Sequence, residues 1–198
     1  MEKISTPLQL IALLIATIAA LIAIYKFFKK RFKPNNTWVR VSETKYSLFI
    51  STPMSSFSTD AAYQQHREEI MELINALRKN TRFKSVYFSG ESLKSQEEFI
   101  TPDHAIMQDF GALEASAVFI MIFPGSVNSS VIVEAGYALA LGKPSIYFVK
   151  DKKELPFMLR EVAQISKAKV KVYEAASMKR VHDVMLQIIN SSSAGNFN

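Results

Sequence analysis

Cysteine is absent from this 198-residue chain, and glycine occurs only six times. Without cysteine the protein forms neither a disulfide nor a thiolate metal site. The sequence also lacks a Gly-rich loop of the GxGxxG or Walker type, which leaves dinucleotide redox chemistry and ATP hydrolysis without support. Its three histidines, His66, His104 and His182, are not spaced with acids as metal ligands are, and we expect them at the surface. The sequence therefore predicts no metal site and no cofactor.

Positive charge is in excess, with a formal net charge of +6. Five of the cations lie in one short run, Tyr25–Lys33 (YKFFKKRFK), which contains no acid. The chain after Lys45 is close to neutral. A nucleic-acid partner needs a basic surface on the folded domain, so we do not expect one here.

A long apolar stretch, Pro7–Phe28, precedes most of this basic run and has no charged residue before Lys26. About 20 apolar residues in a helix span the hydrocarbon layer of a bilayer. A cleaved signal peptide carries its cations before the apolar run, whereas here they follow it. We predict a single transmembrane helix, with residues 1–33 as the anchor and its basic flank; a buried or interfacial helix is the alternative. The charge bias places the amino terminus outside and the remaining chain in the cytoplasm, with the cations at anionic lipid head groups.

Residues 34–45 are predicted to be a linker, and residues 46–190 alternate between strand and helix patterns. Alternation of this kind predicts an α/β domain with a five-stranded parallel sheet, doubly wound in the flavodoxin-like order 2-1-3-4-5. Residues 191–198 are predicted to be a disordered tail. The predicted strands are 45–51, 84–90, 117–125, 144–149 and 169–174, and the predicted helices are 59–80, 101–116, 130–141, 153–164 and 178–189.

A ligand site in such a sheet lies beyond the carboxyl ends of the strands, at the switch in strand order. Two loops are expected there. Residues 51–58 follow the first strand and are rich in hydroxyls, and residues 124–130 follow the third strand and open a helix. Backbone N–H groups at a helix amino terminus bind anions, so the second loop is a candidate anion site.

Glu134 is the only charged residue between Glu114 and Lys143, and its predicted helix is apolar on nearly every side. A capping box places the acid three residues after the cap, whereas Glu134 lies four after Ser130, so helix capping is an imperfect explanation that stays open. A buried carboxylate is costly unless it faces a cleft, and such groups tend to be functional. Asp109 borders the apolar face of its predicted helix, although periodicity alone also allows a solvated acid.

The segment Asp109–Pro144 (DFGALEASAVFIMIFPGSVNSSVIVEAGYALALGKP) resembles the core of the nucleoside 2-deoxyribosyltransferase family. That family includes deoxynucleoside monophosphate N-glycosidases and, more distantly, Toll/interleukin-receptor-type NAD-cleaving domains. Its closing pattern is Glu-x-Gly-x-Ala-x-x-x-x-Lys-Pro. In this chain the pattern is filled by Glu134, Gly136, Ala138, Lys143 and Pro144.

The resemblance implies that Glu134 is a nucleophile that attacks the anomeric carbon of a nucleotide, a nucleoside or NAD. It implies that Asp109 hydrogen-bonds the substrate or passes a proton to the departing base. We also expect a homo-oligomer. The residues implied to bind substrate are Ser51, Thr52, Pro53, Met54, Gly125, Asn128, Ser129 and Ser130.

The chain departs from the family pattern in places. Ser116 and Ala117 stand where the family has an acid, Ser51 and Thr52 stand near the usual glycine, and no Asp precedes Glu134 in its loop. Hydrolysis needs fewer groups than transfer, so a hydrolase is favoured. The leading hypothesis is a membrane-anchored N-glycosidase acting as a stress or phage-defence effector. The alternatives are a non-catalytic, membrane-tethered sensor of a nucleotide-like ligand, and a structural role.

Overall fold

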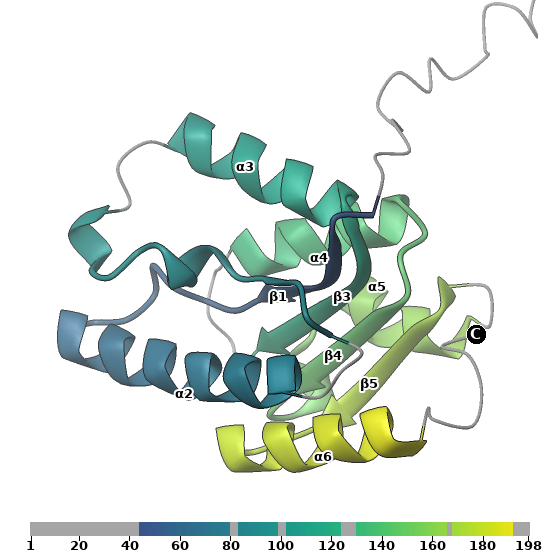
Figure 1. The fold of residues 1–198 in the computed structure, drawn as a ribbon. Coiled ribbons are helices and arrows are strands. Elements are labelled where there is room, and N and C mark those ends of the chain that lie inside the picture. The colour runs from purple at the N-terminus through teal and green to yellow at the C-terminus, as the bar shows by residue number, and fades with distance from the viewer. Residues whose placement is uncertain (1–43, 80–82, 99–101, 124–129, 166–167, 192–198) are drawn as a thin grey trace, which may run out of the picture. The chain divides into compact units, whose positions relative to one another are not determined.

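The computed structural model describes residues 44–79, 83–98, 102–123, 130–165 and 168–191 (Figure 1). These residues all belong to one of the two units into which the chain divides, Val41–Asn198. The predicted anchor, nearly all of the linker and residues 192–198 lie outside the described residues. None of the helices in the described ranges has the length and apolarity that a bilayer crossing requires.

The five strands form one parallel sheet in the order β2-β1-β3-β4-β5, which confirms the predicted doubly wound α/β fold. The sheet pairs are in regular register, with Ser51 of β1 opposite Met121 of β3. The strands are β1 (Tyr46–Ser51), β2 (Val86–Tyr87), β3 (Ser116–Phe123), β4 (Ser145–Val149) and β5 (Val170–Glu174).

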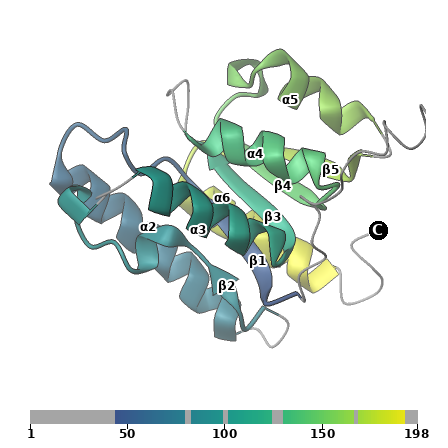
Figure 2. The same ribbon diagram turned by 90° about the horizontal axis from the view of Figure 1, so that it is seen from above.

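Helices cover both faces of the sheet (Figures 1 and 2). Helices α2 (Asp60–Lys79) and α6 (Met178–Ser191) lie on one face. Helices α3 (Pro102–Glu114), α4 (Ser130–Ala140) and α5 (Phe157–Glu161) lie on the other.

The pleat of each strand divides its side chains between the two cores. In β1, Leu48 and Ile50 enter the core beneath α2 and α6, whereas Phe49 enters the core beneath α3 and α4. Residues 118–123 of β3 are all buried because this central strand is covered on both faces. The same alternation decides which face receives each polar side chain where β1 ends.

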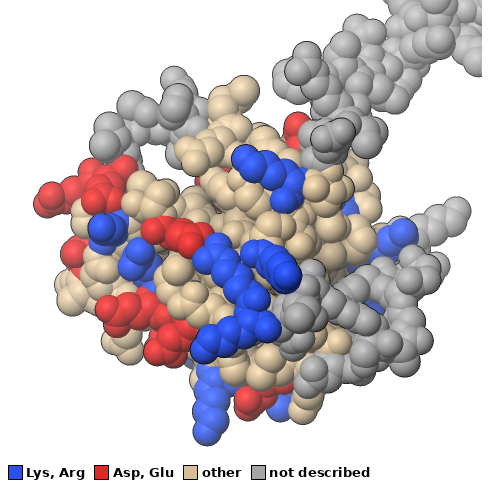
Figure 3. Space-filling view, in the orientation of Figure 1, with Lys and Arg blue, Asp and Glu red and all other residues tan. Residues whose placement is uncertain are grey.

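Helix α2 is capped and charged as its sequence predicts. The Thr59 hydroxyl accepts a hydrogen bond of 3.2 Å from the Ala62 N–H. Asp60 lies in the first turn, and Arg78 and Lys79 lie in the last, which suits the helix dipole. Figure 3 shows this face, on which acidic and basic side chains are both exposed around α2 and several basic ones gather toward its end.

The second strand is much shorter than the predicted range 84–90. It pairs only over Val86–Tyr87, and a 3-10 turn, η2 (Ser89–Glu91), follows it. Two arginines of α2 bind the backbone where the chain leaves the sheet. Arg78 donates a hydrogen bond of 3.1 Å to the Val86 carbonyl, and Arg67 donates one of 2.7 Å to the Gly90 carbonyl.

The single helix predicted over residues 153–164 is wrong, because Pro156 interrupts it. A proline has no N–H and disfavours the helical conformation of the residue before it, and Leu155 is extended, with φ −69° and ψ 140°. The segment therefore forms a 3-10 turn η4 (Lys152–Glu154), the short helix α5 after Pro156, and a second 3-10 turn η5 (Val162–Gln164).

Candidate active site

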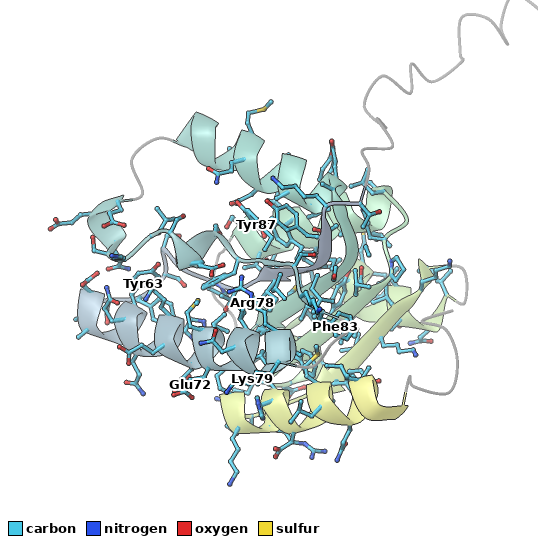
Figure 4. The ribbon with its side chains drawn as sticks, viewed as in Figure 1. Tyr63, Glu72, Arg78, Lys79, Phe83 and Tyr87 are labelled. Carbon is cyan, nitrogen blue, oxygen red and sulfur yellow. The ribbon has the colours of Figure 1, made fainter. Side chains whose placement is uncertain are left out.

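Four elements contribute polar side chains beneath α3 and α4, near the carboxyl ends of β1 and β2. Ser51 is the last residue of β1, Tyr87 is the last residue of β2, Asp109 lies in α3 and Glu134 lies in α4. Tyr87 lies between the sheet edge and α3 (Figure 4). Ser51, Tyr87 and Asp109 each interact electrostatically with another member of the set, so the four form one site.

Glu134 is 9% exposed, which confirms that the lone acid of α4 is buried. Burial raises the pKa of Glu134 to about 7; the nearby charge of Asp109 raises it too, and the hydroxyls of Ser51 and Ser130 lower it. A solvated helix-capping acid would not show this burial. A carboxyl group that titrates near neutral pH is suited to acid–base or nucleophilic chemistry.

Asp109 is half-buried and has one firm partner. The Tyr87 hydroxyl donates a hydrogen bond of 2.8 Å to Asp109 Oδ1. Burial raises the pKa of Asp109, and the Tyr87 hydrogen bond lowers it. Burial and the charge of Asp109 raise the pKa of Tyr87, so the phenol keeps its proton and remains a donor. The pairing does not agree with a freely solvated acid at position 109.

Ser51 and Thr52 follow one another in the chain but face opposite sides of the sheet. Ser51 is 3% exposed; its hydroxyl has no well-aligned hydrogen-bond partner among the described residues, yet lies near enough to Glu134 to lower the pKa of that carboxyl. Thr52 Oγ1 lies 2.7 Å from His66 Nε2 of α2. The two residues therefore lie on different sides of the sheet. Ser51 lies toward Glu134, and Thr52 lies toward α2.

The other residues predicted to bind substrate have different positions. Pro53 is buried, and Met54 is half-buried against the core beneath α2 and α6. Ser130 is exposed at the start of α4, with its hydroxyl near enough to Glu134 to influence its pKa. Gly125, Asn128 and Ser129 lie outside the described residues.

The expectation that the histidines are at the surface is wrong for His66. This residue is 9% exposed, and its ring lies 5.0 Å from the ring of Phe57, centroid to centroid. His182 is half-buried, and the side chain of His104 lies outside the description. The helical periodicity could have predicted the burial of His66, because this residue lies on the buried stripe of α2 that also includes Tyr63 and Ile70.

Tyr87 was not among the predicted site residues, although its position in the sheet could have identified it. It is the register partner of Phe49, and the two rings stack at 5.2 Å. Phe49 points to the α3–α4 face, so a tyrosine beside it must reach the same face. Beyond Tyr87, an open cavity of about 400 Å³ lies along the sheet edge, with Tyr87, Gln108 and Arg78 among its lining residues.

The Lys-Pro end of the resemblance pattern has a structural role. The Lys143 ammonium donates a hydrogen bond of 2.7 Å to the Glu114 carbonyl, and a second one to the Ser116 carbonyl. The Pro144 carbonyl accepts a hydrogen bond of 3.0 Å from the Phe119 N–H. These bonds hold the end of α3 to the start of the central strand β3, at the amino ends of the strands and away from Glu134.

No metal-binding group emerges from this geometry. Among the residues described here, no cluster of three or more His, Cys, Asp or Glu side chains is placed to hold an ion. What the arrangement offers is two interacting carboxyl groups, a tyrosine donor and a buried serine hydroxyl. Two carboxyl groups with raised pKa values suit a reaction that needs both a nucleophile and a proton carrier.

No protein-family model matches the chain, and no curated protein sequence matches it either. A solved structure with a similar fold is that of the CMP N-glycosidase BcmB from Clostridium botulinum, with a TM-score of 0.52 and 20% sequence identity. The comparison covers 71% of this chain and 98% of the BcmB chain. The similarity shows that the two chains share a fold.

Proposed function

We propose that this protein is an N-glycosidase that hydrolyses the bond between base and sugar in a nucleotide, a nucleoside or NAD. One observation carries the proposal: Glu134 is a buried carboxyl whose pKa is raised to about 7, and Asp109 and Ser51 lie near it. The fold similarity to a CMP N-glycosidase supports the same reaction class. The loops around Glu134 differ from the family pattern, and these differences favour water rather than a second base as the acceptor of the sugar.

The proposed first step uses Glu134 as the nucleophile. One carboxylate oxygen of Glu134 attacks the anomeric carbon while the C–N bond breaks, and the bonding electron pair leaves with the base. Asp109 in its protonated form supplies a proton to the departing base. Burial raises the pKa of Asp109 above its ordinary value, which is the direction that this step requires.

The second step regenerates the enzyme. A water molecule attacks the anomeric carbon of the glycosyl ester, its proton passes to Asp109, and Glu134 leaves as the carboxylate. Tyr87 holds Asp109 in place for both steps through its 2.8 Å hydrogen bond. The Ser51 hydroxyl supplies a hydrogen bond to the Glu134 carboxylate or to a sugar hydroxyl.

The cellular location and role of this activity are proposed from the sequence. Residues 1–33 are proposed to anchor the protein in the bilayer with the α/β domain in the cytoplasm, and an effector role in stress or phage defence is proposed on that combination. A reporter at the carboxyl terminus tests the topology. Homo-oligomerisation is proposed as well. Ile106 and Met107 of α3 and Val133 of α4 are exposed apolar side chains of the kind that an interface between copies covers.

The decisive experiment is base release by the purified full-length protein. CMP, dCMP, a panel of other nucleotides and nucleosides, and NAD are incubated with the wild type, and the free base is measured by chromatography. Glu134→Gln keeps the side-chain shape and removes the nucleophile, so it should release no base. Glu72→Gln changes an exposed acid of α2 and serves as the matched control. Binding of one compound without any release by the wild type would favour the sensor alternative.

A further inference from the structure

The end of β1 connects Glu134 to helix α2 through two adjacent residues. Ser51 faces Glu134, and Thr52, which is 5% exposed, turns to the other face of the sheet. There the Thr52 hydroxyl lies 2.7 Å from Nε2 of the buried His66. One peptide unit therefore separates the residue that contacts His66 from the residue that faces Glu134, and the pleat of the strand sends their side chains to opposite faces.

His66 itself sits on a firmly held part of α2. The adjacent Arg67 donates a hydrogen bond of 2.7 Å to the Gly90 carbonyl, and Tyr63 donates one of 2.8 Å to the Leu93 carbonyl. The ring of Phe57 covers the imidazole. Burial lowers the pKa of His66, so the ring is neutral at neutral pH and bonds to Thr52 without a charge.

We propose that His66 is a positioning residue that holds Thr52 and thereby keeps the Ser51 hydroxyl against Glu134. The inference rests on the proposed function for its catalytic meaning, but its geometry does not involve a substrate. Two further contacts hold the loop that follows β1. The Gln96 amide donates a hydrogen bond of 3.1 Å to the Phe57 carbonyl and one of 3.5 Å to the Met54 carbonyl.

A histidine with a purely structural role would leave the pKa of Glu134 unchanged, whereas a positioning role predicts that its loss changes that pKa. Among the residues that the structure describes, the groups that act on Glu134 are Asp109 from α3, Ser51 from β1 and Ser130 from α4 itself. Tyr87 of β2 also interacts with it electrostatically. Ser51 opposes the effect of burial on this carboxyl. Displacing Ser51 while Asp109 and Tyr87 stay in place must raise the pKa of Glu134 further.

The test measures the ionisation of Glu134 directly in the full-length protein, by infrared difference spectroscopy of its carboxyl band. The band is identified by its loss in Glu134→Gln. Ser51→Ala and His66→Phe are both expected to raise the pKa of Glu134, by up to about one pH unit, because the Ser51 hydroxyl then no longer lies beside the carboxylate. His66→Gln keeps a nitrogen near the Nε2 position and should restore the wild-type value.

Two further variants exclude general loosening or misfolding as the explanation. Ile70→Val removes one methyl group from the same buried stripe of α2 and should leave the pKa of Glu134 unchanged. Thr52→Val keeps the shape of the threonine and should behave like His66→Phe, so it replaces that variant if the latter does not fold. An unchanged pKa in Thr52→Val or His66→Phe, or an equal rise in Ile70→Val, would overturn the proposal.

The outcomes for the two proposals are separable because the infrared measurement needs no substrate. A wild type that releases no base, combined with the expected rise in His66→Phe, would end the N-glycosidase proposal and retain the role of His66. Base release with an unchanged pKa in His66→Phe would do the opposite. In an active enzyme, His66→Phe should lower kcat at neutral pH more than it changes KM, because Ser51 acts on the nucleophile.

Discussion

The Tyr87 hydroxyl donates a 2.8 Å hydrogen bond to Asp109 Oδ1 and so joins the edge strand β2 to helix α3. Strand β2 comprises only Val86–Tyr87, so its last residue both closes the sheet edge and orients a carboxyl of the candidate site. Because the pKa of Tyr87 is raised, the phenol donates this bond throughout the physiological pH range. The fold thus holds Asp109 in one orientation before any substrate arrives.

Tyr87→Phe removes this donor and keeps the aromatic packing. The pKa of Asp109 should rise, since the hydrogen bond holds it down. Base release should nevertheless fall about tenfold at neutral pH, because Asp109 loses the hydrogen bond that orients it. A pH–rate profile measures both effects. Tyr46→Phe is the matched control, because Tyr46 lies 5.2 Å from Tyr87 in the same aromatic cluster. Equal rates in Tyr87→Phe and the wild type would contradict a positioning role.

Glu134→Gln should abolish base release and also change how stability depends on pH. The folded-state pKa of about 7 lies above the ordinary value of 4.5, so the native protein holds a proton between these values that the unfolded chain has lost. Wild-type stability should therefore fall as pH rises from about 4.5 to about 7, by about 3 kcal/mol in all.

The Glu134→Gln variant has no such titration, so it should unfold at higher urea concentration than the wild type at pH about 8 and show little difference at pH about 4.5. Urea unfolding at the two pH values checks this expectation. A variant that loses stability at both pH values would identify Glu134 as a helix-terminus stabiliser, worth roughly 0.3–1 kcal/mol.

Asp109→Asn should slow base release less than Glu134→Gln does. Proton transfer and positioning typically contribute about 10²–10⁴-fold, whereas loss of the nucleophile removes the covalent route altogether. The expected pattern is a residual, measurable rate for a substrate with a natural base, and a smaller defect for a substrate whose base leaves without a proton. Equal loss with both leaving groups would remove the proton-donor role from Asp109.

Lys143→Met should destabilise the fold without a specific loss of activity. Its ammonium group donates to the Glu114 and Ser116 carbonyls, and leaving such carbonyls without a partner costs about 1–3 kcal/mol. Thermal and urea unfolding measure the loss, and kcat per folded molecule should stay at the wild-type level. Lys171→Met is the control, because Lys171 is exposed on β5. A large drop in kcat at unchanged stability would place Lys143 in the reaction.

Deletion of residues 1–33 should give a soluble protein that retains the α/β fold, because all five strands of the sheet lie between Tyr46 and Glu174. Membrane fractionation compares the full chain with the shortened one, and near-UV circular dichroism measures whether tertiary packing is kept. A shortened chain that still partitions with membranes, or that lacks a near-UV signal, would contradict the proposed anchor boundary.

Local periodicity alone was enough to predict the fold. Apolar runs and helical stripes identified the five strands and the helices other than the segment around Pro156, and the alternation of strands with helices favours a parallel, doubly wound sheet. Glu134 was identifiable for a similar reason, since a single acid in an apolar helix signals a buried charge. Pro156 also indicated a helix break in the sequence, but the helical pattern on both sides of it led to the prediction of one continuous helix.

The sequence by itself thus determined the order of the elements and the burial of Glu134, because both depend on residues close together in the chain. The tertiary structure alone decided which side chains meet. Tyr87 and Asp109 are 22 residues apart, Thr52 and His66 are 14 apart, and Lys143 and Glu114 are 29 apart. Each pair forms only because the packing of helices on the sheet brings two faces together, and no local preference of either residue specifies its partner.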